Sequence, residues 1–255
     1  AFGRRVPSLA AMETSTRTHV LVLGSRSAIG RKLIAHLESQ SLEVIPVSSA
    51  RCDLLDAASV ERLIAELKPR AHAIRYAVHL STTYGRQDLP MARHVARIVN
   101  ALAVPRLVFL SSWVVMLDKS WVSTGYIETK RQVEAFFRDS WHDEPARLRV
   151  VRPSVVVGDT SLMHQRILDA LALVPDLVPS QLARCFVPVG DVVACIADVG
   201  SQEEGLRTHC VLGPLKSVRE ATGVSEPTGL VRSVVHAALA PARLALYVLV
   251  CVLAW

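Results

Sequence analysis

The chain has 255 residues, of which 51% are hydrophobic and 5% aromatic, and its formal net charge at pH 7 is +6. This length and apolar content suit one α/β domain with a sizeable core. The arginines are scattered without interleaved aromatic residues, which argues against a nucleic-acid groove and favours an anionic small molecule or an anionic membrane surface. Five cysteines without a C-x-x-C pair argue against a disulfide framework and against a metal site, and indicate a cytoplasmic protein.

A strand, a glycine turn and a helix follow an N-terminal extension, residues 1–17, which we expect to be flexible because it has no apolar run. Residues 19–23 predict a buried strand, and apolar residues at helical spacing from Ile29 onward predict a helix. Gly24 allows a tight turn and Gly30 allows close packing of helix on strand, although a small residue replaces the usual middle glycine. The helix N-terminus can bind a pyrophosphate. The segment predicts a dinucleotide site, with an ordinary strand–helix turn as the alternative.

The second predicted strand, residues 42–47, ends without the carboxylate that binds the adenosine ribose hydroxyls in NAD-dependent enzymes. Arg26 in the glycine turn and Arg51 after the strand could bind a 2′-phosphate through charge-assisted hydrogen bonds. We therefore predict NADP in preference to NAD, with solvated surface arginines as the alternative. Asp56 is well placed to cap the next helix, which Pro69 ends.

The run EVIPVSSARCDLLDAASVERLIAELKP, residues 43–69, resembles the extended short-chain dehydrogenases/reductases (the NAD-dependent epimerase/dehydratase family), especially dTDP-4-dehydrorhamnose reductases and nucleotide-sugar epimerases. The resemblance implies an α/β fold: a Rossmann-type doubly wound parallel sheet with a small C-terminal substrate cap. It also implies that Asp53 and Leu54 contact the adenine. Residues 76–82 resemble the family strand whose end lines the cofactor ribose, although Ser81 and Thr82 stand where alanines are usual. His79 within this apolar run is interpreted as a core histidine.

A serine, a tyrosine and a lysine carry the predicted chemistry. Residues 106–112 resemble the family strand that delivers a catalytic serine or threonine, and the register favours Ser112. Tyr126 and Lys130 stand four residues apart, so on a helix the ammonium lies beside the phenol and favours its ionised form. In the family, residues in this order act as general acid/base (Tyr126), as its activator and ribose ligand (Lys130), and as a hydrogen-bond donor to the substrate oxygen (Ser112). A surface amphipathic helix is the alternative.

The resemblance continues to about residue 214. Residues 148–158 resemble the sixth strand of the family, in which Pro153 would border the nicotinamide. Residues 185–199 predict a strand followed by a helix, and residues 208–214 predict one more strand. Residues 159–233 are expected to interleave a small substrate cap with these elements.

The last residues, 234–255, are strongly apolar, but Pro241 interrupts them. They are interpreted as an apolar helix that binds a membrane, as a helix that covers the fold or a homodimer interface, or as the beginning of a longer segment.

The leading hypothesis is an NAD(P)-dependent oxidoreductase or epimerase that interconverts a secondary alcohol and a ketone on a nucleotide sugar or related metabolite. Residues 18–158 would hold both the cofactor and the triad of Ser112, Tyr126 and Lys130. The predicted cofactor-binding residues are Gly24, Ser25, Arg26, Ser27, Ile29, Gly30, Arg51, Asp53, Leu54, Leu80, Ser81, Thr82, Tyr126, Lys130 and Pro153. The alternatives are a membrane-associated dehydrogenase of a lipid or sterol-like alcohol, at the cytoplasmic membrane face, and a non-catalytic NADP-binding module.

Overall fold

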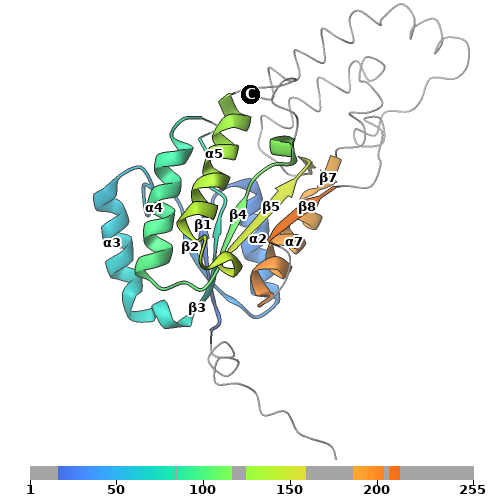
Figure 1. Ribbon diagram of the computed structural model, residues 1–255. Helices are drawn as coiled ribbons and strands as arrows, with labels where there is room; N and C mark the ends of the chain where they lie inside the picture. Colours follow the sequence, from blue (N-terminus) through green and yellow to red (C-terminus); the bar gives the residue numbers. More distant parts are fainter. Residues whose placement is uncertain (1–16, 84, 117–124, 159–185, 204–206, 213–255) are drawn as a thin grey trace, which may run out of the picture.

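A six-stranded parallel sheet, in the order β2-β1-β3-β4-β5-β8, forms the centre of the computed structural model (Figure 1). The structure describes residues 17–83, 85–116, 125–158, 186–203 and 207–212. The strands are β1 (His19–Leu23), β2 (Glu43–Val47), β3 (Ile74–His79), β4 (Leu107–Leu110), β5 (Leu148–Pro153) and β8 (Thr208–Val211). The predicted doubly wound parallel sheet is confirmed.

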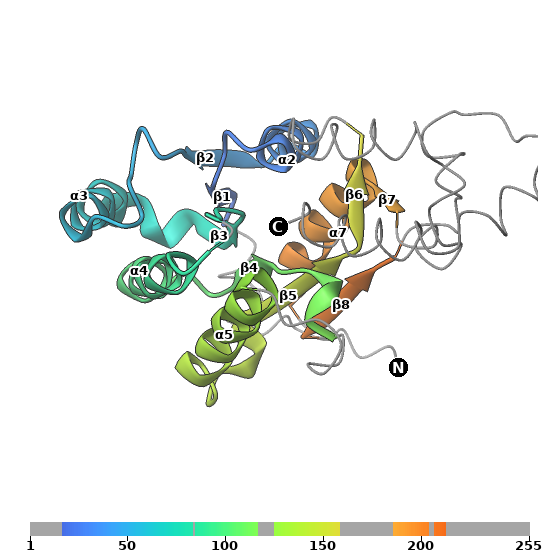
Figure 2. The same ribbon diagram turned by 90° about the horizontal axis from the view of Figure 1, so that it is seen from above.

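Helices cover both faces of this sheet (Figure 2). One face carries α3 (Ala57–Leu67), α4 (Asp88–Ala101) and α5 (Gly125–Ser140), and the other carries α2 (Ala28–Ser39) and α7 (Val189–Ser201). Side chains alternate along β1: Leu21 and Leu23 join the core under α3, α4 and α5, whereas Val20 and Val22 join the core under α2 and α7. Burial on both faces explains why the strand sequences are continuously apolar.

Polar side chains cap the first two helices. Ser27, which was not predicted as a cap, is the N-cap of α2 and accepts a hydrogen bond from the Gly30 amide. Asp56 is the N-cap of α3 and accepts from the amides of Ala58 and Ser59. The chain then continues as the 3₁₀ helix η1 (Lys68–Ala73), which contains Pro69.

The region predicted as one strand over residues 148–158 is two strands in the structure. β5 ends at Pro153, and β6 (Val155–Val157) pairs with β7 (Phe186–Pro188) in a separate two-stranded sheet. Between them the Ser154 amide donates to the carbonyl of Val211 on β8. Because a proline has no N–H to donate, the ladder is interrupted where the chain leaves the main sheet.

Three arginines at the amino ends of β3, β4 and β5 lie near the C-terminal end of α7. Arg75 and Arg106 donate to the carbonyls of Ser201 and Gly200 at 3.2 and 2.6 Å, and the buried Arg149 donates to the carbonyl of Ala146 at 2.9 Å. The end of a helix leaves carbonyl groups unpaired and carries a partial negative charge, so cations stabilise it. Arg75 and Arg106 therefore fix the end of α7 at the amino edge of the sheet.

Several predicted segments lie outside the described residues: the N-terminal extension up to residue 16, most of the substrate cap, and the apolar residues 234–255. Among the residues that the structure describes, no helix has the length and apolarity needed to cross a membrane.

Candidate active site

The strand order places a switch point between β1 and β3, because the chain moves from β1 to β2 on one side and then returns to β3 on the other. Ligands of such sheets bind at the carboxyl ends of the strands beside this point. Gly24 follows β1 with a φ of +94°, and a Cβ there would lie 2.8 Å from the Ser81 amide nitrogen. Only glycine fits both this backbone conformation and this close approach. The glycine turn and the residues after β3 are thus in direct contact.

The N-terminus of α2 opens next to that contact. A Cβ on Gly30 would lie 2.9 Å from both the Ser25 carbonyl oxygen and the Ser27 hydroxyl, so Gly30 lets the helix begin against the turn. Ser25 is buried, Arg26 and Ser27 are exposed, and Ile29 is half-buried. The helix start can receive a pyrophosphate, and the two glycines let it pack closely against the turn that follows β1.

The predicted adenine-side residues have protein partners of their own. Arg51 forms an ion pair with Glu66 and donates to the Pro46 carbonyl at 2.7 Å. Asp53 is exposed, and its carboxylate accepts from the Leu55 amide at 2.9 Å. To bind a phosphate, Arg51 would have to break its ion pair with Glu66. The exposed Arg26 could bind a phosphate without breaking an ion pair that the structure records. Leu54, which the family resemblance also assigned to the adenine, is buried in the core under α3 and α4.

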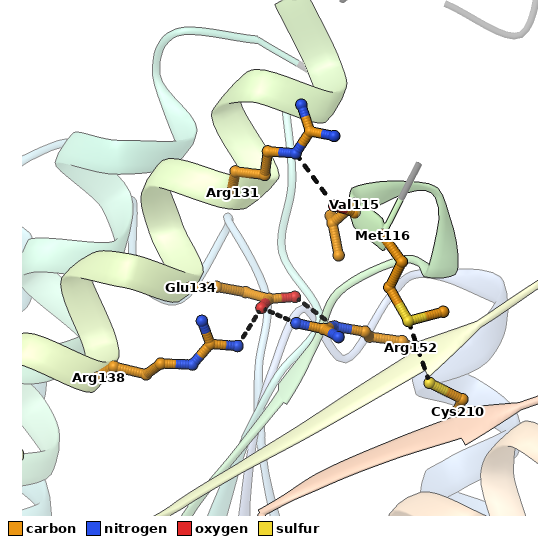
Figure 3. A network of polar contacts seen from close by, with 7 residues as sticks. All are labelled: Val115, Met116, Arg131, Glu134, Arg138, Arg152 and Cys210. Atoms are coloured by element: carbon orange, nitrogen blue, oxygen red, sulfur yellow. Dashed lines mark hydrogen bonds and ion pairs between the residues drawn. The ribbon is translucent and has the colours of Figure 1, made fainter. Parts of the chain in front are cut away.

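Ser112 follows β4 directly and precedes the 3₁₀ helix η2 (Trp113–Met116). Ser111 is buried and Ser112 is half-buried, which favours Ser112 as the serine that a ligand can reach. The Arg131 guanidinium of α5 donates to the carbonyl of Val115 at 3.0 Å (Figure 3). This hydrogen bond links η2 to the helix that carries the predicted tyrosine and lysine.

Tyr126 and Lys130 lie on the same side of α5, as their spacing predicted. The Lys130 ammonium nitrogen is 5.7 Å from the centre of the Tyr126 ring and 5.2 Å from that of the Phe109 ring on β4. Tyr126 is half-buried, whereas Lys130 is only 4% exposed. Burial lowers the pKa of Lys130 below its usual value, and the negative charge of Asp88 opposes this shift.

Asp88 is a buried group at this site that the sequence did not predict. It lies in the first turn of α4 and is 3% exposed, and its Oδ2 lies 3.7 Å from the Lys130 nitrogen, which is an ion-pair distance. Asp88 and Lys130 are far apart in the sequence, and an acid in the first turn of a helix is common, because it complements the helix dipole. No local signal therefore marked it.

A second buried carboxylate anchors α5 one turn beyond Lys130. Glu134 is 2% exposed and accepts two hydrogen bonds from Arg152 of β5, at 3.0 and 2.6 Å (Figure 3). The half-exposed Arg138 donates to the same carboxylate at 2.7 Å. This pairing raises the pKa of Arg152. It ties α5 to the strand that ends in the buried Pro153, the residue predicted to border the nicotinamide.

His79, at the end of β3, is a core residue as predicted. Its ring is 2% exposed and lies 5.6 Å from the Phe109 ring and 6.1 Å from the Phe137 ring. Burial, together with the positive charge of Lys130, lowers the pKa of His79 to about 3, so the ring is neutral. Leu80 follows His79 and is buried, whereas Ser81 and Thr82 are half-buried at the carboxyl edge.

No group of acids, histidines and cysteines that could hold a metal occurs within the described ranges.

The structure brings most of the predicted residues to one edge of the sheet. The glycine turn, the residues after β3, Ser112 and Pro153 all follow the carboxyl ends of neighbouring strands, and Tyr126 and Lys130 cover this edge from α5. The arrangement combines a place for a dinucleotide with a phenol, an ammonium and a hydroxyl. Such a set can exchange a proton with an alcohol or carbonyl oxygen.

Comparison with known proteins gives a family match for part of the chain. Residues 18–111 match the family model described as the RmlD substrate binding domain. This match confirms the resemblance that the sequence indicated over these residues. No curated protein matches the chain in sequence.

Several solved structures share the fold at low sequence identity. A GDP-L-fucose synthetase from Naegleria fowleri bound to NADP has a TM-score of 0.63 at 12% identity, over 83% of this chain and 83% of that one. A UDP-N-acetylglucosamine 4-epimerase from Bacillus cereus has a TM-score of 0.58 at 13% identity, over 80% and 82%. A dTDP-4-dehydrorhamnose reductase from Bacillus anthracis in complex with NADP has a TM-score of 0.56 at 16% identity, over 77% and 74%. At these identities the likeness establishes the fold.

Proposed function

We propose that this chain is an NADP-dependent oxidoreductase or epimerase that interconverts a secondary alcohol and a ketone on a nucleotide sugar or a related metabolite. One observation carries the proposal: Tyr126 and the buried Lys130 lie together over the end of β4, at the same sheet edge as the glycine turn. The family match and the NADP-bound structures of similar fold support the cofactor and the substrate class.

The cofactor fits the glycine turn and the residues after β3. Gly24 and Gly30 let the turn after β1 pack tightly against the residues after β3 and against the start of α2, and the N-terminus of α2 offers amide groups to a pyrophosphate. Arg26 is exposed beside this helix start and can bind a 2′-phosphate without losing an ion pair that the structure records. When bound, the nicotinamide supplies the hydride chemistry.

The protein residues supply the proton transfer. Tyr126 donates a proton to the carbonyl oxygen as the ketone is reduced, or accepts it as the alcohol is oxidised. The Lys130 ammonium stabilises the phenolate form of Tyr126, and its remaining N–H groups can bind the ribose hydroxyls. The Ser112 hydroxyl donates a hydrogen bond to the substrate oxygen as negative charge develops on it. The low polarity around Lys130 strengthens each of these interactions.

Fluorescence titration with NADPH and NADH tests the cofactor directly. We expect NADPH to bind more tightly, and we expect Arg26→Ala to weaken NADPH binding by about tenfold while leaving NADH binding unchanged, because only NADPH has the 2′-phosphate. Arg62→Ala is the matched control, since Arg62 is a surface arginine 3.8 Å from Asp56. A protein that binds neither nucleotide would refute the proposal.

A panel of substrates then tests the reaction class. Nucleotide sugars, with and without a keto group, and hydrophobic ketones are offered together with the cofactor. NADPH oxidation is followed by absorbance, and epimerised sugar, which forms without net NADPH oxidation, is followed by chromatography. Preference for the nucleotide sugars supports the proposed substrate class, whereas preference for hydrophobic ketones would favour a dehydrogenase of lipid-like alcohols. NADPH binding without turnover of any substrate would support a binding module.

A further inference from the structure

Asp88 is a buried carboxylate for which the proposed reaction has no direct use. Its Oδ1 accepts hydrogen bonds from the Thr83 amide at 2.6 Å and from the Thr83 hydroxyl at 2.8 Å. Its Oδ2 accepts from the Thr82 hydroxyl at 2.6 Å and lies 3.7 Å from the Lys130 nitrogen. One side chain therefore joins the residues after β3, the start of α4 and the lysine of α5.

These contacts suit a carboxylate and not a neutral acid. All three hydrogen bonds come from groups that donate to Asp88, and donors of this kind favour the charged form. A buried charge without a partner is strongly unfavourable, and here the partner is the Lys130 ammonium. The side chains of both residues are at most 5% exposed, so solvent screens the pair little.

The groups around Lys130 leave Asp88 as the carboxylate that balances its charge. The described groups that face Lys130 are Asp88 from α4, His79 from β3, Phe109 from β4, and Tyr126 and Glu134 from α5. The His79 ring is neutral because burial lowers its pKa to about 3. The Glu134 carboxylate is already paired with Arg152 and Arg138.

We propose that Asp88 is a positioning residue: its carboxylate keeps Lys130 protonated beside the Tyr126 ring and fixes Thr82 and Thr83 next to it. The importance of this pair for turnover rests on the proposed function, whereas the pair itself does not. Thr82 is among the residues predicted to line the cofactor ribose. Because Asp88 contacts both Lys130 and Thr82, a shift of either residue should also move the other.

Titration of Lys130 by NMR tests the pair without cofactor or substrate. The protein is labelled with ¹³C at the lysine ε carbon, and the signal of Lys130, one of five lysines, is identified by its loss in Lys130→Met. In Asp88→Asn we expect the titration midpoint of Lys130 to fall by about one pH unit or more, because an opposite charge is removed from a buried site. Glu61→Gln removes a half-exposed carboxylate that pairs with Arg97, and it should leave the midpoint unchanged. An unchanged midpoint in Asp88→Asn would overturn the proposal.

A reciprocal variant covers the case in which Asp88→Asn does not fold. Lys130→Met keeps the apolar stem of the side chain and removes its charge. This leaves the buried Asp88 carboxylate without its cation, so the midpoint of urea unfolding should move to a lower urea concentration than in the parent protein. An unchanged unfolding midpoint in Lys130→Met would overturn the proposal.

Kinetics separate this inference from the proposed function. If both hold, the alkaline limb of the kcat/KM profile of Asp88→Asn moves to lower pH together with the Lys130 midpoint, and NADPH binds about tenfold more weakly above that midpoint. A shifted Lys130 midpoint in a protein that binds no nucleotide would overturn the proposed function alone. A shifted midpoint with an unmoved kcat/KM profile would overturn the positioning role.

Discussion

At the carboxyl edge of the sheet two buried cations pair with buried carboxylates, whereas three arginines at the amino edge donate to backbone carbonyl groups. Lys130 and Arg152 pair with Asp88 and Glu134 at the carboxyl edge. At the amino edge, Arg75, Arg106 and Arg149 donate to carbonyls. A carbonyl partner cannot change its charge and an arginine does not lose its proton, so the amino edge can only hold α7 in place.

The carboxyl edge differs because its groups can exchange protons. Burial lowers the pKa of Lys130 and of His79, and a half-buried phenol lies beside the lysine. Arg106 also has a lowered pKa, because of its burial and the neighbouring Arg149, but an arginine starts far above the physiological range. A buried charged side chain therefore indicates a candidate active site only where its partner can gain or lose a proton.

The largest loss of stability is expected from breaking the pair that anchors α5 at the carboxyl edge. Glu134→Ala leaves Arg152 without its carboxylate at a site where the arginine side chain is only 15% exposed. Removal of one partner from a buried pair costs about 3–5 kcal/mol of unfolding free energy. Urea unfolding measures this change. Arg138→Ala removes the half-exposed arginine from the same carboxylate and should cost less than about 1 kcal/mol. Equal losses in the two variants would contradict the distinction between them.

The second effect is a pH dependence that belongs to the carboxyl edge. His79 stays neutral in the folded protein down to about pH 3, whereas it binds a proton near pH 6.5 in the unfolded chain. The unfolded state therefore binds more protons between these values, and stability falls as the pH falls through this window, by about 1.4 kcal/mol per pH unit. Urea unfolding at pH 6 and pH 4 should show that His79→Leu removes this part of the slope.

Arg106, at the amino edge of the sheet, provides the control for the pH effect. Arg106→Met lowers stability by removing a partner of the α7 carbonyls, but it should leave the slope between pH 6 and pH 4 as it is, since no group that titrates in this range is removed. A His79→Leu protein with the parent slope would show that the histidine does not titrate differently in the two states.

The smallest of these effects concerns packing at the amino edge. A Cβ at Gly200 would overlap the fully buried Tyr76 ring, so Gly200→Ala should cost about 1–3 kcal/mol of unfolding free energy. Gly190→Ala on the same helix meets nothing within 4 Å and should be neutral or stabilise by about 0.5–1 kcal/mol. Thermal unfolding measures both. Because the amino edge has only a structural role, Gly200→Ala should not change NADPH affinity, and a loss of affinity in this variant would contradict that distinction between the two edges.

The sequence was most informative where chemistry depends on neighbours in the chain. The glycine turn, the cap Asp56 and the pairing of Tyr126 with Lys130 follow from local spacing. The family resemblance implied a parallel sheet, and the parallel pairing of the six strands confirmed it.

The contacts that the sequence did not reveal join distant segments. Asp88 meets Lys130, and Arg152 meets Glu134, only after the sheet has formed. Glu134 could have been noticed, because it continues the helical spacing of Tyr126 and Lys130 by four more residues, but nothing local indicated its partner. Arg51 was predicted to bind phosphate, yet its pairing with Glu66 depends on the fold. Long-range charge pairs follow from topology, which local patterns do not specify.

The variant Tyr126→Phe shows whether Tyr126 transfers the proton in an NADP-dependent reaction. The measurement is the rate of NADPH oxidation with the ketone that the parent protein reduces fastest, together with the NADPH dissociation constant of each protein. We expect kcat/KM to fall by about 100- to 10,000-fold while the dissociation constant changes less than about threefold, because only the acid/base group is removed. Turnover by Tyr126→Phe at a rate close to that of the parent protein would contradict the account.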